Sequence, residues 1–305
     1  MEGVIVKSTG SWYDVRDNEG VLHRCRLKGK FKIKGLKVTN PIAVGDHVLV
    51  ELENQHGTGV IYDIRPRQNY LIRSSAKHPE IGNILASNID QAILIATLVR
   101  PKTSLGFIDR YLVSAETFRI PVMLVFNKTD IYNDHQMEEL NVTVQLYQSI
   151  GYTSLITSFT ENTGMVELST HLGHKISLLS GHSGVGKSTL LNLLIPEEKQ
   201  NISPISDFSS KGVHTTTFAE MFQLAPDSYI IDTPGIKELG LMEIGKEELS
   251  HYFPEMRALM GLCKYHNCTH VHEPKCAVME AINRTVPETR YLSYLSMLEN
   301  SDNRR

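Results

Sequence analysis

One segment constrains the fold of this chain more than any other. Residues 181–188 read Gly-His-Ser-Gly-Val-Gly-Lys-Ser, with an apolar stretch before them at 176–179 and a helical pattern after them at 189–194. A glycine-rich turn that leads from a strand into a helix can wrap its backbone N–H groups around a phosphate, and the helix N-terminus adds positive potential. The pattern therefore predicts a P-loop within an α/β domain.

The residues of this loop have separate expected tasks. Lys187 reaches the β- and γ-phosphates of a nucleotide and is a candidate catalytic residue, while the Ser188 hydroxyl is expected to bind Mg²⁺. The backbone of the loop encloses the phosphates. The nucleotide contacts expected here are Gly181, Ser183, Gly184, Val185, Gly186, Lys187, Ser188 and Thr189.

A second motif, Asp232-Thr233-Pro234-Gly235, follows a predicted strand that begins near Tyr229. This position places the Asp232 carboxylate near the Mg²⁺ and the Gly235 N–H where it could sense the γ-phosphate. Both residues are therefore candidate nucleotide contacts.

A third motif, Asn127-Lys128-Thr129-Asp130, ends the strand predicted at 122–126. The Asp130 carboxylate can accept hydrogen bonds from N1–H and the exocyclic amine of guanine, whereas adenine presents an acceptor there. Asn127, Lys128 and Asp130 are therefore the candidate base-binding residues. After the next strand, Ser158 in the pair Thr157-Ser158 would supply a backbone contact to the guanine O6.

The order of these motifs is unusual. In ordinary small GTPases the base-reading motif lies downstream of the phosphate motifs, whereas here residues 127–130 precede residues 181–188. This order indicates a circular permutation, which preserves a fold when the original termini lie close together at the surface. The segment after Gly235 then leads directly into the C-terminal region, so hydrolysis could move that region.

The segment 201–217 is rich in serine and threonine and is the expected switch. One of the threonines at 215–217 should complete the Mg²⁺ shell, with Thr216 as the candidate. Ile236 stands where Ras-like enzymes carry the glutamine that orients water, so slow intrinsic turnover is expected. His214 is a candidate catalytic residue that positions water; a loop histidine or a partner contact is the alternative.

The N-terminal region alternates short apolar segments with turn residues, which predicts a small five-stranded barrel of the OB type. Its predicted strands are 3–7, 11–15, 21–27, 46–51 and 59–64. Basic side chains on even positions form one stripe, because the side-chain period of a strand is two. The stripe consists of Arg24, Arg26, Lys28, Lys30, Lys32 and Lys34. We favour an RNA contact on this face; a solvated sheet face or a lysine-guarded edge is the alternative.

Beyond residue 67 the pattern alternates strands with helices, which predicts a mostly parallel sheet covered on both faces. The predicted strands are 92–98, 122–126, 154–156, 176–179, 218–224 and 229–231. A helix is predicted at 105–118 because apolar residues recur on one stripe. The region after Leu241 is helical by pattern and ends in a helix predicted at 290–299.

Three of the four cysteines crowd into fourteen residues, while Cys25 stands alone. Three histidines lie among them, so a structural Cys₃His zinc site is the economical interpretation. The clustered cysteines are Cys263, Cys268 and Cys276, and spacing alone does not choose among His266, His270 and His272. Reduced thiols without a metal are the alternative.

The composition limits the number of domains and the classes of partner that the chain can have. A chain of 305 residues with 41% hydrophobic residues can form two or three domains with their own cores. No run approaches the roughly 18 apolar residues of a membrane span, and no basic segment followed by a long apolar stretch opens the chain, so we expect no membrane association and a cytoplasmic location. The net charge of −3 gives no overall case for nucleic-acid binding.

Together the permuted order, the P-loop, the segments 212–217 and 232–241, and the cysteine cluster resemble the bacterial small-ribosomal-subunit biogenesis GTPases of the RsgA/YjeQ/YloQ family. The resemblance covers essentially the whole chain. It implies an OB-fold RNA-binding domain at 1–68, a circularly permuted P-loop GTPase domain at 69–240 and a mainly helical zinc-binding domain at 241–305.

The resemblance also implies site residues. It selects the zinc ligands as Cys263, Cys268, His270 and Cys276, and it matches His214 to the histidine proposed as catalytic in the family. Val213 departs from the basic residue expected there, which bears on a local phosphate or rRNA contact.

The activity implied is hydrolysis of GTP to GDP and phosphate, with Mg²⁺, stimulated by the small (30S) ribosomal subunit. The enzyme would bind the immature subunit and its rRNA in the GTP form and leave in the GDP form during late maturation; we expect a monomer. An RNA-binding module with a vestigial nucleotide site and a GTPase with a non-ribosomal partner are the competing hypotheses. Intact nucleotide-site residues such as Lys187 and Asp130 argue against the first of these.

Overall fold

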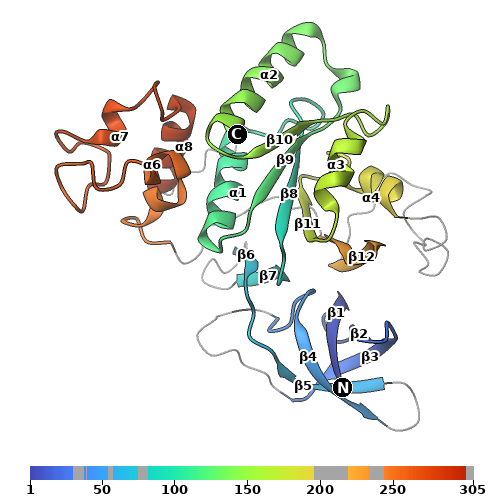
Figure 1. The fold of residues 1–305 in the computed structure, drawn as a ribbon. Helices are drawn as coiled ribbons and strands as arrows, with labels where there is room; N and C mark the ends of the chain where they lie inside the picture. Colours follow the sequence, from blue (N-terminus) through green and yellow to red (C-terminus); the bar gives the residue numbers. More distant parts are fainter. Residues whose placement is uncertain are drawn as a thin grey trace.

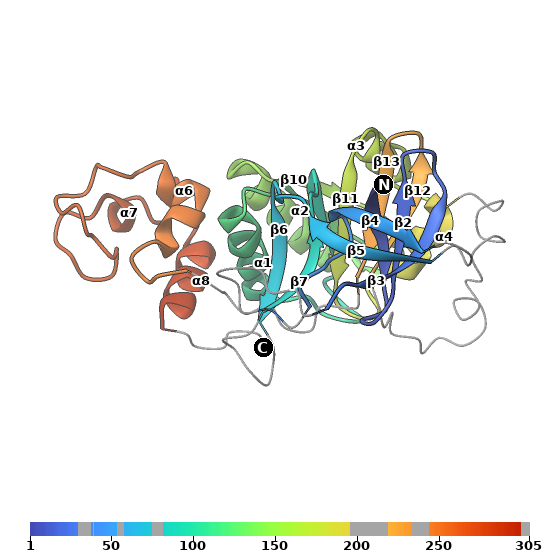
Figure 2. The ribbon, with the colours of Figure 1, turned by 90° about the horizontal axis from the view of Figure 1, so that it is seen from below.

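A computed structural model of the chain describes residues 1–29, 38, 40–53, 58–74, 82–195, 219–233 and 244–299. A β-barrel, a helix-covered sheet and a C-terminal helical region follow one another along the sequence (Figure 1). The C-terminal region lies on the side of the sheet opposite to α3 and α4, whose bounds are Met165–Leu172 and Lys187–Leu194 (Figures 1 and 2).

The predicted N-terminal barrel is confirmed. Its strands are β1 (Glu2–Ser8), β2 (Tyr13–Asp17), β3 (Leu22–Leu27), β4 (His47–Glu53) and β5 (Thr58–Ile64). The antiparallel pairs β1–β2, β2–β3, β4–β5 and β1–β4 are joined by the parallel pair β3–β5, so every strand has two neighbours. Closure removes the free edges within the barrel.

Part of the basic stripe lies among the described residues. In β3, Arg24 and Arg26 are exposed while Cys25 between them is fully buried, as a period of two predicts. The Arg24 guanidinium lies 5.1 Å from the centroid of the Trp12 ring, and Arg26 forms a 2.6 Å ion pair with Glu53. Three predicted members of the stripe lie outside the described residues: Lys30, Lys32 and Lys34.

The predicted central sheet is confirmed. Its strands are β8 (Gln91–Ala96), β9 (Val122–Phe126), β10 (Thr153–Ile156), β11 (Ile176–Gly181), β12 (Glu220–Ala225) and β13 (Ser228–Asp232). They lie in the order β10-β9-β8-β11-β13-β12, and only β12 runs antiparallel to its neighbour β13. The parallel arrangement brings the carboxyl ends of five strands to one edge of the sheet.

Helices cover both faces of this sheet. One face carries α1 (Leu105–Thr117) and α2 (Asp134–Ser149), and the other carries α3 and α4. Neighbouring residues of β8 face opposite layers: Leu94 packs in the core that includes α1, and Ile95 packs in the core that includes α4. Burial on both faces explains why these strands are continuous apolar runs.

A short hairpin, β6 (Tyr70–Ser74) with β7 (Gly82–Ser87), connects the barrel to the central sheet and was not predicted from sequence. Near it, the Arg67 guanidinium donates two 2.6 Å hydrogen bonds to the Asp46 carboxylate, which also accepts a 2.6 Å bond from the Ser87 hydroxyl. Asp46 is fully buried, so this network holds the barrel to the hairpin.

The barrel also meets the central sheet directly. Strand β1 pairs with β12 at Lys7 and Glu220, whose side chains form a 2.9 Å ion pair. The Arg16 guanidinium lies 4.5 Å from the centroid of the Tyr229 ring in β13. The barrel therefore continues the sheet beyond its β12 edge.

The C-terminal region is helical, as predicted. It contains η2 (Leu249–Tyr252), α6 (Pro254–Arg257), α7 (Ala277–Glu280) and α8 (Glu288–Leu298). These segments pack around a core that includes Phe253, Val286 and Tyr294. Among the helices that the structure describes, none is long and apolar enough to cross a membrane.

Candidate functional site

The sequence motifs meet at one edge of the central sheet. Asn127 follows β9, Ser158 follows β10, the P-loop follows β11, and Asp232 ends β13. All four strands run in the same direction, so these loops share the carboxyl edge of the sheet. In open α/β sheets, ligands bind at this edge.

Two glycines allow the P-loop backbone to lie close to neighbouring residues of the sheet edge. Gly186 has a φ of +111°, and a β-carbon there would lie 2.5 Å from Nδ2 of Asn127. Gly181 has a φ of +144°, and a β-carbon there would lie 2.6 Å from the carbonyl oxygen of Ile95. Side chains at these two positions would therefore force the loop out of place.

Lys187, the first residue of α4, is held across the loop. Its ammonium donates hydrogen bonds to the carbonyl oxygens of Gly181 at 2.8 Å and His182 at 2.9 Å. Burial lowers the pKa of Lys187, and the nearby Asp232 carboxylate acts in the opposite direction. A lysine ammonium has three donors, so two hold the loop and the third can reach a phosphate oxygen.

Asn127 ties two of the loops together. It is 3% exposed, and its Nδ2 donates a 2.9 Å hydrogen bond to the Val185 carbonyl oxygen in the P-loop. Its Oδ1 accepts a 3.0 Å bond from the Phe159 N–H. In addition, the Tyr132 hydroxyl donates to the Asn127 carbonyl oxygen at 2.9 Å. The contacts of Phe159 and Tyr132 were not predicted, since no local pattern marks them.

Asp130 is exposed at the same edge and is oriented by Ser158, whose hydroxyl donates a 2.7 Å hydrogen bond to Asp130 Oδ1. Lys128 donates a 2.6 Å bond to the Arg100 carbonyl oxygen. The N–H of Ser158 donates to the Thr163 carbonyl oxygen at 3.2 Å. Ser158 therefore contacts Asp130, the candidate guanine-binding residue, through its hydroxyl and not through its backbone N–H.

The remaining predicted site residues divide into three groups. Exposed positions in the P-loop and at the start of α4 are those of Ser183, Gly184, Ser188 and Thr189. Asp232 is 2% exposed at the end of β13. Three predicted site residues lie outside the described part of the chain: His214, Thr216 and Gly235. Val213, where the family pattern has a basic residue, lies outside it too.

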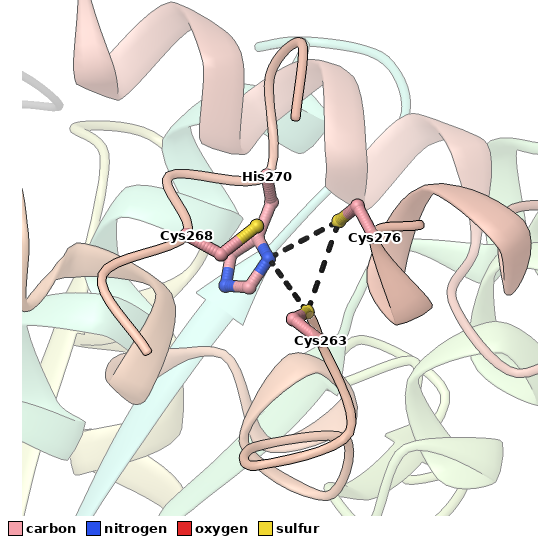
Figure 3. A group of neighbouring side chains, drawn as sticks. All are labelled: Cys263, Cys268, His270 and Cys276. Atoms are coloured by element: carbon pink, nitrogen blue, oxygen red, sulfur yellow. Dashed lines mark hydrogen bonds between the residues drawn. The ribbon is translucent and has the colours of Figure 1, made fainter. Parts of the chain in front are cut away.

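The cysteine cluster forms a compact group in the C-terminal region (Figure 3). It contains Cys263, Cys268, His270 and Cys276, whose ligand atoms all lie within 4.8 Å of one another. Three thiols and one imidazole are the donor set of structural zinc sites, so these residues fit a metal ion. His270 is thus the histidine that the fold brings to the thiols.

Within the cluster, His270 Nδ1 lies 3.4 Å from the Cys276 sulfur and 3.6 Å from the Cys263 sulfur (Figure 3). Helix α8 supports the loop that carries it, since the Tyr291 hydroxyl donates to the His270 carbonyl oxygen at 2.7 Å. The Tyr294 hydroxyl makes a 2.6 Å bond to the neighbouring Thr269 carbonyl oxygen. These two hydrogen bonds hold the loop that places His270 beside the thiols.

Two family models match the chain: RsgA GTPase over residues 64–242 and RsgA N-terminal domain over residues 2–61. The sequence is 52% identical over 307 residues to Small ribosomal subunit biogenesis GTPase RsgA of Cytophaga hutchinsonii, with 100% of both chains covered. It is 49% identical over 303 residues to Small ribosomal subunit biogenesis GTPase RsgA 2 of Bacteroides thetaiotaomicron, covering 99% of this chain and 97% of that relative.

Solved structures are similar over the whole chain. YjeQ from Thermotoga maritima matches with a TM-score of 0.76 and 34% identity, covering 100% of this chain and 99% of that one. YloQ, described as a circularly permuted GTPase, matches with a TM-score of 0.71 and 28% identity, covering 100% of this chain and 96% of that one.

Proposed function

Because this chain belongs to the RsgA family of circularly permuted GTPases, we propose that it binds the small ribosomal subunit and acts in its late maturation. The chain is a GTP-hydrolysing enzyme. The subunit would stimulate the conversion of GTP to GDP and phosphate, and the GDP form would then leave it.

One observation of the structure carries the nucleotide part of this proposal: the predicted base-binding and phosphate-binding residues form a single connected edge. Asn127 bridges to the P-loop at Val185, and Ser158 holds Asp130 at the same edge of the sheet. A carboxylate there can read the guanine donors while the P-loop binds the phosphates. The geometry therefore supports guanine nucleotide as the ligand.

Within this proposal, Lys187 binds the β- and γ-phosphates and stabilises the charge that develops on them. Ser188 and Asp232 would hold the Mg²⁺, which neutralises phosphate charge when it is bound. Thr216 is proposed to complete the Mg²⁺ shell, and Gly235 to contact the γ-phosphate. His214 is proposed to position the attacking water.

The C-terminal cluster is proposed to hold one structural zinc ion. Four protein ligands fill a tetrahedral shell, so no position remains for a substrate. The role would be to stabilise a region in which short helices, such as α6 and α7, surround a small core.

The barrel is proposed to contact rRNA. Arg24 is exposed and stacked on Trp12, and stacked or charged side chains on barrel faces are common in RNA recognition. The Arg26 charge is partly balanced by Glu53, which leaves Arg24 as the stronger candidate of the two arginines. We propose a cytoplasmic monomer with domains at 1–68, 69–240 and 241–305.

Turnover of GTP by the purified protein tests the proposal. The rate would be measured alone, with small ribosomal subunits and with large subunits, and ATP would replace GTP as a substrate control. Stimulation by small subunits only is expected. GTP turnover that neither subunit changes would keep the GTPase activity and remove the ribosomal role. Rising salt should weaken binding to the small subunit if the contact is to rRNA.

A further inference from the structure

Helix α1 contacts the P-loop with one face. The Phe107 ring lies 4.0 Å, centroid to centroid, from the His182 ring. One turn later, the Tyr111 hydroxyl donates a 2.8 Å hydrogen bond to Ser180 Oγ. Phe107 and Tyr111 are four residues apart, so both side chains lie on the same face of the helix.

These two contacts reach the part of the loop that holds the Lys187 ammonium. The carbonyl oxygens that hold the Lys187 ammonium belong to His182 and Gly181. Phe107 packs against His182 itself, and Tyr111 bonds to Ser180, the residue before Gly181. The position of α1 therefore sets the position of the two carbonyl groups that orient Lys187.

Another face of α1 contacts the C-terminal region (Figures 1 and 2). Asp109 Oδ1 accepts a 2.8 Å hydrogen bond from Arg290 in α8, and Val113 is fully buried in the C-terminal core. Glu116 forms a 2.9 Å ion pair with Arg257 in α6. Residues 109, 113 and 116 share a helical face by their spacing.

The contact at Asp109 is a buried ionic network. Arg290 is fully buried, and its Nε also donates a 2.7 Å hydrogen bond to Glu255. Its guanidinium lies 4.5 Å from the centroid of the Phe253 ring, and Tyr147 donates a 2.8 Å bond to Asp109. Buried charges lose most of their stabilisation if their partners move away, so the network allows little sliding of α1 against α8.

We propose that α1 couples the nucleotide site to the C-terminal domain, with Phe107 and Tyr111 as positioning residues for Lys187 and with Asp109, Glu255 and Arg290 as the anchor at the other end. Where the proposed function holds, a ribosomal contact made by the C-terminal domain would reach Lys187 by this route. The coupling itself requires no ribosome. Because coupling between two sites is reciprocal, nucleotide binding must also act on the C-terminal domain, and we expect it to stabilise that domain.

Hydrogen–deuterium exchange of the full-length, zinc-loaded protein tests this coupling. Saturating GDP is expected to slow exchange of the backbone amides in α8, although α8 lies outside the nucleotide site. In Phe107→Leu and Tyr111→Phe, the effect of GDP on α8 should fall by roughly fivefold or more. The P-loop peptide of each variant should remain protected, which proves that GDP is bound.

Phe118→Leu is the matched control, because Phe118 ends the same helix but packs against Tyr70, with ring centroids 4.5 Å apart. This variant should retain the effect of GDP on α8. Arg290→Lys tests the anchor, since it keeps the charge but lacks the planar fork of donors. Arg290→Lys should lose the effect of GDP on amide exchange in α8, while its P-loop peptide stays protected by GDP.

Turnover supplies a second readout. Lys187 is proposed to contact the γ-phosphate, which GDP lacks, so Phe107→Leu and Tyr111→Phe should lower kcat for GTP more than they weaken GDP binding. The proposal is overturned if GDP leaves α8 exchange unchanged in the wild type, if these variants or Arg290→Lys keep the full effect, or if Phe118→Leu loses it equally. No ribosomal subunits are present, so a failed ribosomal role would not affect the result.

Discussion

The side-chain amide of Asn127 donates a 2.9 Å hydrogen bond to the carbonyl oxygen of Val185, which joins two loops that lie 58 residues apart in sequence. The same side chain accepts a bond from Phe159. One buried residue thus links β9, the P-loop and the loop after β10. The nucleotide edge has a defined shape because these loops share it.

Replacing Asn127 with alanine should weaken both folding and GDP binding. The substitution leaves the Val185 carbonyl and the Phe159 N–H without this partner, and an unsatisfied buried group costs about 1–3 kcal/mol. Urea unfolding would measure the lower free energy of unfolding, and calorimetry would measure GDP affinity. Asn133→Ala is the control: it removes the N-cap of α2, should cost about 1 kcal/mol, and should leave GDP affinity unchanged.

Replacing Asp130 with alanine should reduce discrimination between GTP and ATP. Hydrogen bonds to a charged group contribute about 1.5–3 kcal/mol, so the preference for GTP should fall by roughly 10- to 150-fold. Competition between the two nucleotides would measure it. Ser158→Ala should act in the same direction but less strongly, because it only frees the carboxylate, and Asp134→Ala on the exposed start of α2 should have no effect. An unchanged preference in Asp130→Ala would remove the base-reading role.

Replacing Asp46 with alanine should destabilise the attachment of the barrel. Arg67 would then be left in a nearly buried position without its carboxylate, and removing one partner of a buried pair costs about 3–5 kcal/mol. Thermal unfolding and limited proteolysis between the barrel and the hairpin β6–β7 would detect the change. Glu53→Ala breaks the exposed pair with Arg26 and should leave the melting temperature almost unaltered.

Removing the proposed zinc ion should unfold the C-terminal region before the central sheet. Cys276→Ser, or a chelator, is expected to lower bound zinc and expose the C-terminal region to protease, because a metal site of this kind contributes folding free energy. Elemental analysis and mapping of the cleavage sites would follow both effects. Cys25→Ala, in the barrel, should keep its full zinc content; a wild-type zinc content in Cys276→Ser would contradict the ligand assignment.

Local features of the sequence were sufficient to predict much of the fold. Each nucleotide motif follows its strand within a few residues, so the position of Asp130 after β9 could be read from one short segment. The alternation at Cys25 likewise predicted which side of β3 is buried. The clustering of the cysteines was visible in the sequence, although their spacing alone did not select His270 among the three histidines.

Long-range contacts could not be predicted in this way. Arg290 and Asp109 are 181 residues apart, and no periodic pattern marks two charges that bury each other. The predicted apolar stripe of α1 was incomplete for the same reason. That stripe consists of Leu105, Ile108, Leu112 and Ala115. Leu105 is 36% exposed, whereas Phe107 and Tyr111, which are not on the stripe, are buried because α1 is packed between the sheet and the C-terminal region.

The pairing of β1 with β12 has a consequence for association between molecules. Without the barrel, β12 would be the outermost strand of the central sheet, and its unpaired N–H and C=O groups could template a strand from another molecule. Lys7 and Glu220 mark where β1 occupies that position. The N-terminal barrel therefore protects the start of β12, and a fragment that begins at the hairpin would expose that part of the edge to strands of other molecules.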